Sequence, residues 1–176
     1  MAEAGFQFEV DPPQNDEIHD ESMDVRDLTA LNAKLKAEEI ASAHADAVVL
    51  AADTLVLLGD RVLGKPKSRE EATQMLADLN GNTHQVFTAF CLYRKQDGRI
   101  FQQAVATDVR FKNLSEEERA EYHRLIEPMD KAGAYAAQDH GAKIIDQFSG
   151  SMTNVIGLPM DEVVVALESE FGLVPG

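Results

Sequence analysis

Four helices are predicted where apolar residues recur every three or four positions along the chain. Each is expected to begin at a polar cap or at a proline, and the four starts are Asp24, Ser68, Ser115 and Pro159. The first helix is expected to run to about Ala45 after an acidic loop. Its apolar residues, Val25, Leu28, Leu31, Leu35 and Ile40, are expected on or near one side.

Strands are predicted where apolar and β-branched residues cluster. Residues 6–10 predict a short strand, and residues 83–94 and 100–112 predict a hairpin joined at Asp97-Gly98. Residues 48–52 lack polar alternation, as expected of a strand buried on both faces of an α/β sheet. Asp53 follows this run, so we expect its carboxylate at a strand end, where the ligand sites of open sheets collect. The alternation of elements predicts an α/β fold.

Length, charge and cysteine content narrow the function classes. The 176 residues fit one domain, or two small lobes around a cleft. The net charge of −15 disfavours a nucleic-acid polymer as partner, but it allows a small phosphorylated ligand accompanied by a divalent metal. The single cysteine, Cys91, is expected to be a buried thiol. No signal peptide or membrane span is recognised, so we expect a cytoplasmic protein without a membrane partner.

Two short segments contain residues that could bind or act on a phosphorylated ligand. Asp53-Thr54 follows the apolar run, and Gly64-Lys65-Pro66 follows a tight turn, so a carboxylate and a cation are expected at neighbouring strand ends. The spacing of Gly59 and Gly64-Lys65 resembles a P-loop, but Pro66 stands where that motif needs a hydroxyl and disfavours a helix after Lys65. Taken alone, these motifs are more typical of a turn-capping Asp53 and a solvated Lys65, and it is the other motifs along the chain that favour phosphate chemistry.

Several separate motifs follow one another along the chain. They are Ala51-Ala52-Asp53-Thr54, Leu63-Gly64-Lys65-Pro66, Leu79-Asn80-Gly81, residues 127–135 (EPMDKAGAY) with Gln138, and residues 154–159 (NVIGLP). In these motifs and in their order the chain resembles the Maf family of nucleotide pyrophosphatases. This resemblance implies a two-lobed Maf/inosine triphosphatase-like fold with a mixed sheet and a central cleft, as a single domain over residues 1–176. It implies hydrolysis of a nucleoside triphosphate to the monophosphate and pyrophosphate, with Mg or Mn as the divalent metal.

The resemblance also implies roles for individual residues. Asp53 matches a proton acceptor, Lys36 and Lys65 match phosphate-binding lysines, and Thr54 and Gln138 match positions linked to base specificity, here that of the branch acting on dTTP and UTP. Glu17 matches a functional acidic residue, expected to hold the metal together with Asp53. A competing alignment places that acidic role within residues 20–22, and a charge run of this kind is also typical of a solvated loop.

The sequence departs from the family at its start, where a strand, a Ser-x-Ser-x-Arg-Arg loop and a helix are expected. We therefore expect an N-terminally shortened form with reduced activity, and an exposed strand edge that favours a homodimer. The alternative is a catalytically impaired nucleotide-binding or regulatory protein linked to cell division. An inosine triphosphatase is a more distant alternative, because its motifs do not match.

Overall fold

The computed structural model describes residues 1–20, 22–138 and 140–176, and these divide into two compact units. Unit 1 comprises residues 1–53, 88–105 and 157–176, and unit 2 comprises residues 54–87 and 106–156. Helices and strands occur in both, so the predicted α/β class is confirmed. The organisation as a single domain stays a prediction.

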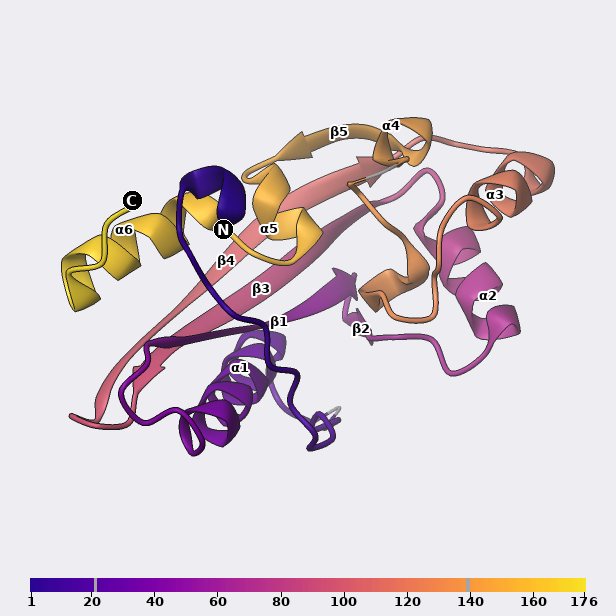
Figure 1. Cartoon of the computed structure of the whole chain (residues 1–176). Helices are drawn as coiled ribbons and strands as arrows, with labels where there is room; N and C mark the ends of the chain where they lie inside the picture. The colour runs from indigo at the N-terminus through magenta and orange to yellow at the C-terminus, as the bar shows by residue number, and fades with distance from the viewer. Residues whose placement is uncertain (21, 139) are drawn as a thin grey trace. The chain divides into compact units, whose positions relative to one another are not determined.

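Five strands form one open sheet with the order β2-β1-β3-β4-β5 (Figure 1). The strands are β1 (Val49–Leu58), β2 (Arg61–Leu63), β3 (Thr83–Arg94), β4 (Arg99–Phe111) and β5 (Ile145–Ser149). The pair β1 and β2 is antiparallel, with Val56 opposite Leu63, and β5 pairs antiparallel with β4. The β3–β4 hairpin is confirmed, and β2 ends shortly before Lys65, where a neighbouring strand end was expected, whereas β5 was not predicted.

The described helices are α1 (Val25–Ala41), α2 (Arg69–Leu79), α3 (Glu116–His123), α4 (Gly141–Ile144), α5 (Met152–Ile156) and α6 (Met160–Phe171), with 3₁₀ turns η1 (Ala2–Ala4) and η2 (Ala132–Ala134). All four predicted helix starts are confirmed, and Ser115 with Glu118 forms a complete capping box. At Ser68 the hydroxyl accepts from the Glu71 N–H, but the Glu71 carboxylate accepts from the Lys67 N–H instead of completing the box. None of the helices in the described part of the chain combines the length and apolar character that a bilayer crossing requires.

In unit 1, α1 and α6 cover opposite faces of the strands, as Figure 1 shows. Along β1 and β3, odd-numbered residues face α1 and even-numbered residues face α6, because successive side chains of a strand alternate between faces. The α1 side contains Val49, Ala51, Ala89, Cys91 and Tyr93; the α6 side contains Val48, Leu50, Ala52, Phe90 and Leu92. Burial on both faces explains the unbroken apolar run, and the buried thiol is confirmed.

Two sequence-based expectations for unit 1 are wrong. Helix α1 ends at Ala41. Val25 and Leu28 are buried as predicted, but the rest of its buried face is made of small or polar residues, and Leu35 is 40% exposed. The apolar spacing pointed to leucine, but alanines let the helix approach the strands closely. Residues 6–10 form no strand: Phe6 packs in the core beside α6, and the following residues are exposed, with Val10 at 82%.

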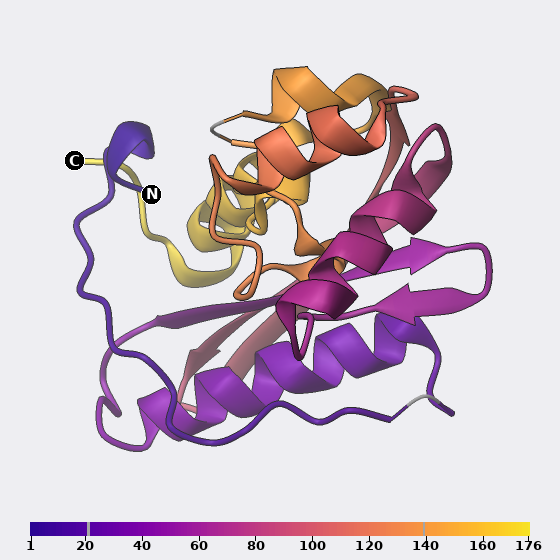
Figure 2. The same cartoon turned by 90° about the vertical axis from the view of Figure 1, so that its right-hand side faces the viewer.

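The core of unit 2 lies between α2, α3 and strand residues. The inward face of α2 consists of Ala72, Met75, Leu76 and Leu79, as predicted, and α2 lies beside α3 (Figure 2). His84 is part of this core at 2% exposure, and its Nε2 lies 2.9 Å from the Tyr135 hydroxyl. Burial lowers the pKa of His84 to about 4, and its Nδ1 has no hydrogen-bond partner among the described residues.

We expect His84 to make unfolding pH-dependent in mild acid. In the unfolded chain the imidazole binds a proton near its ordinary pKa of 6.5, whereas the folded protein resists protonation until about pH 4. The free energy of unfolding should therefore fall as the pH drops from 6.5 to 4, by roughly 3 kcal/mol in total. Urea unfolding of the wild type and of His84→Phe at several pH values measures this contribution as a difference. If the unfolding free energy changed with pH in the same way in both proteins, His84 would not be the cause of the pH dependence.

Candidate active site

The ammonium group of Lys36 lies between two carboxylates in unit 1. Its Nζ is 2.7 Å from Asp53 Oδ1, 2.8 Å from Glu17 Oε1 and 3.3 Å from the Ala52 carbonyl oxygen. These three contacts match the three protons that an ammonium can donate. The structure thus brings together Glu17, Lys36 and Asp53, which the sequence places on a loop, a helix and a strand.

Strand and helix periodicity explain why these side chains meet. Residues 49 and 51 of β1 face α1, and Asp53 continues that alternation. Asp53 does not lie at a strand end as expected, because β1 continues to Leu58. A carboxylate can be buried within a strand when its oxygens are paired, and here Lys36 supplies the partner.

Asn32 belongs to the same cluster, although the sequence analysis did not single it out. It lies one helical turn before Lys36 and is 4% exposed. Its Oδ1 accepts from the Ile18 N–H at 2.9 Å, and its Nδ2 donates to the Ile18 carbonyl at 3.1 Å. The same Nδ2 lies 3.5 Å from Asp53 Oδ2. The Asn32 side chain therefore holds Ile18, the residue after Glu17, against α1. The signal that could have revealed Asn32 is an asparagine on the buried side of the helix, four positions before a candidate lysine.

The electrostatics of the cluster favour a charged lysine. Burial alone would lower the pKa of Lys36, but hydrogen bonds and charge attraction from Asp53 and Glu17 outweigh that effect and raise the pKa. The side chains are 18% exposed for Lys36, 23% for Glu17 and 5% for Asp53. Two carboxylates around one ammonium leave the ionised cluster with a net negative charge.

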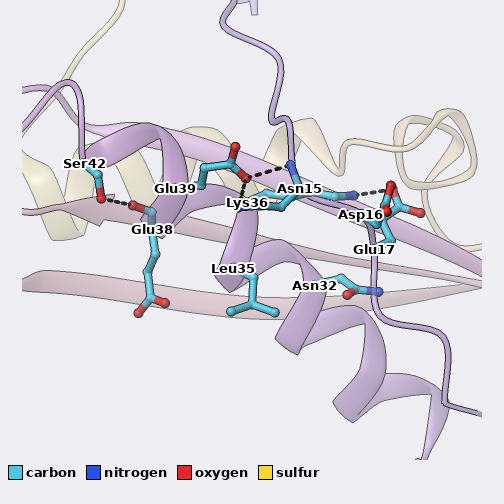
Figure 3. Close-up of a pocket in the computed structure, with 9 residues that line it drawn as sticks. All are labelled: Asn15, Asp16, Glu17, Asn32, Leu35, Lys36, Glu38, Glu39 and Ser42. Atoms are coloured by element: carbon cyan, nitrogen blue, oxygen red, sulfur yellow. Dashed lines mark hydrogen bonds and ion pairs between the residues drawn. The ribbon is translucent and has the colours of Figure 1, made fainter.

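A pocket of about 590 Å³ adjoins the cluster along α1 (Figure 3). Residues 15–17 form one wall, and Asn32, Lys36 and Glu39 of α1 lie along the other. The Glu39 carboxylate accepts from the Gln14 N–H at 2.7 Å and from Asn15 Nδ2 at 2.9 Å, so it holds the loop in place. The pocket is therefore open beside Glu17 and Lys36 and bounded largely by acidic and amide side chains.

Comparison with known proteins identifies the family. A family model described as Maf-like protein matches residues 1–170. The chain belongs to the Maf family. A dTTP/UTP pyrophosphatase of Syntrophus aciditrophicus is 43% identical over 164 residues, which cover 93% of this chain and 80% of that protein. Proteins of the same name from Akkermansia muciniphila and Aquifex aeolicus are 41% and 40% identical, covering 95% and 98% of this chain and 87% and 88% of their own lengths.

The other residues that the Maf resemblance singles out lie in unit 2. Thr54 is the next residue of β1, Lys65 is exposed just after β2, and Gln138 is exposed in a turn. In unit 1, Asp20 accepts hydrogen bonds from the Ser22 N–H and hydroxyl, while Glu21 lies outside the described residues. The contact with Lys36 favours Glu17 over the competing alignment.

We expect Asn32→Leu to release the loop that carries Glu17. The change keeps the number and branching of the side-chain heavy atoms but removes both hydrogen bonds to Ile18, so the Ile18 amide should exchange its hydrogen about tenfold faster. Asn15→Leu is the matched control, because Asn15 lines the same pocket and contacts Glu39 instead. Amide exchange followed by NMR provides the measurement. Unaltered protection of Ile18 in Asn32→Leu would show that the loop is held by other contacts.

Proposed function

We propose that this Maf protein is a nucleotide pyrophosphatase that hydrolyses dTTP and UTP to the monophosphate and pyrophosphate. The observation that carries the proposal is the contact of Lys36 with Asp53 and Glu17 beside an open pocket. The relatives named dTTP/UTP pyrophosphatase, about 40% identical over most of the chain, support the choice of substrate.

The reaction needs a base at the attacked phosphorus. The oxygen of a water molecule forms a bond to the α-phosphorus, the bond from that phosphorus to the α–β bridging oxygen breaks, and pyrophosphate leaves. The water proton passes to the Asp53 carboxylate, whose Oδ1 lies 2.7 Å from the Lys36 nitrogen. Asp53 then returns the proton to solvent or to the leaving pyrophosphate.

The charge of the cluster fits a divalent cation. Glu17 and Asp53 both contact the Lys36 nitrogen, so their oxygens lie close together, and carboxylate oxygens are the ligands that Mg²⁺ prefers. A cluster with net negative charge would repel a triphosphate without a compensating cation. Among the described residues no group of three or more His, Cys, Asp or Glu could hold a metal. Glu17 and Asp53 alone would thus hold Mg²⁺ or Mn²⁺ only if substrate oxygens and water supplied the remaining ligands, and the bound ion would neutralise charge on the phosphoryl oxygens.

The lysines and the base-contacting residues have separate tasks. Lys36 keeps Glu17 and Asp53 oriented, and it can turn a proton toward a phosphate oxygen when the substrate arrives. Lys65 supplies a second cation for phosphate. Gln138 can donate and accept hydrogen bonds in one plane, which suits the imide edge of thymine or uracil, and Thr54 adds a hydroxyl for the same selection.

Pyrophosphate release with Mg²⁺ or Mn²⁺ tests the proposal. The wild type should hydrolyse dTTP and UTP faster than dATP and GTP, and Asp53→Asn should lower kcat for dTTP by about 10²- to 10⁴-fold because the base is lost. Asp46→Asn provides the control, since Asp46 is an exposed turn residue. Thermal unfolding verifies that each variant is folded.

Two results would overturn parts of the proposal. Faster turnover of a purine triphosphate would contradict the substrate, and undiminished turnover in Asp53→Asn would remove Asp53 as the base. Nucleotide binding by the wild type without any pyrophosphate release would favour the alternative of a regulatory nucleotide-binding protein.

A further inference from the structure

A buried tyrosine in unit 2 fixes the backbone shortly before Gln138. Tyr122 of α3 is 1% exposed. Its hydroxyl accepts from the Ala136 N–H at 2.9 Å and donates to the Ala136 carbonyl at 2.9 Å. One hydroxyl thus satisfies both backbone polar groups of a single buried residue, two positions before Gln138.

The same segment is tied to the turn that carries Lys65. The Gly133 N–H donates to the Gly64 carbonyl at 3.0 Å, and Lys65 is the next residue after Gly64. Gly133 has φ 68°, and a Cβ there would lie 3.2 Å from Val56 Cγ2, so this close approach requires glycine. The segment from Gly133 to Gln138 therefore connects the candidate phosphate contact to the candidate base contact.

The backbone between these two attachments is strained. Ala134 has φ 59°, a left-handed conformation that residues with a side chain rarely adopt. Such conformations persist where surrounding contacts over-determine them, often at functional sites. Here the neighbouring contacts come from α3, because His123 Nε2 lies 3.1 Å from the Ala134 carbonyl and Tyr122 holds Ala136.

We propose that Tyr122 is a positioning residue for nucleotide selection, an inference that rests on the proposed function. The ribose of a nucleotide fixes the distance between its base and its phosphates. The protein can therefore discriminate pyrimidine nucleotides from the larger purine nucleotides only if Gln138 and Lys65 are held at a fixed separation. Tyr122 supplies that restraint through Ala136. A tyrosine that served the core alone would lower the folded fraction and reduce every rate in proportion, whereas a positioning tyrosine alters the ratio between substrates.

Tyr122→Phe tests the inference, because it deletes one oxygen and keeps the ring. Selection is measured as the ratio of kcat/KM for dTTP to that for dATP, and as the ratio of the association constants of their α,β-methylene analogues in the same order, which needs no turnover. Both ratios should fall about tenfold, toward the values of Gln138→Ala, since buried partners lose their hydrogen bonds. The Gly133 amide should also exchange faster. Tyr93→Phe removes the same atom from a partly buried tyrosine of unit 1 and should change none of these values.

The outcomes separate this inference from the proposed function. Unchanged ratios in Tyr122→Phe overturn the positioning role, even if the protein is less stable. Unchanged exchange at Gly133 overturns the connection between the two attachments. A wild type that hydrolyses no nucleotide overturns the proposed function, while a fall in the analogue ratio on Tyr122→Phe would still support the positioning role.

Discussion

The partly buried ion pair between Lys36 and Asp53 is the interaction on which the geometry of the candidate site depends. Removing two charges from water costs several kcal/mol per ion, and only good geometry with further hydrogen bonds offsets it. The site supplies these bonds, because the ammonium also contacts Glu17 and the Ala52 carbonyl, and Asn32 faces the second Asp53 oxygen. Apolar residues of similar volume often stabilise a protein as well as such a pair does. The pair is therefore weak evidence for a role in stability, and the proposed phosphate chemistry would give it another role.

The small residues of α1 make this pair possible. Ala33, Ala37 and Ala41 are fully buried against strand residues, so the helix lies close to the sheet. Larger side chains at these positions would hold the helix further away and take Lys36 out of reach of Asp53. The unusual burial pattern of the helix and the location of the candidate site thus have one cause.

Local signals in the sequence predicted much of the fold, and tertiary contacts account for the rest. The helix starts and the β3–β4 hairpin follow from capping and turn residues near in sequence. Residues 6–10 do not form the expected strand, because a strand needs a neighbouring strand to pair with, and no local sequence pattern reveals whether one is present. In the site, motifs pointed to Lys36 and Asp53 as candidates, and the structure places them in contact. Asn32 was missed because its contacts depend on the backbone of Ile18, on a separate loop.

A double-mutant cycle on Lys36 and Asp53 tests this account most directly. Lys36→Met alone leaves a buried carboxylate without its main partner, so Lys36→Met/Asp53→Asn should be more stable than Lys36→Met, with a coupling energy of about 1–3 kcal/mol. The double variant should nevertheless release no pyrophosphate from dTTP, because both the base and the cation are gone. Additive losses of unfolding free energy, or dTTP turnover by the double variant, would contradict the claim that the pair is kept for chemistry.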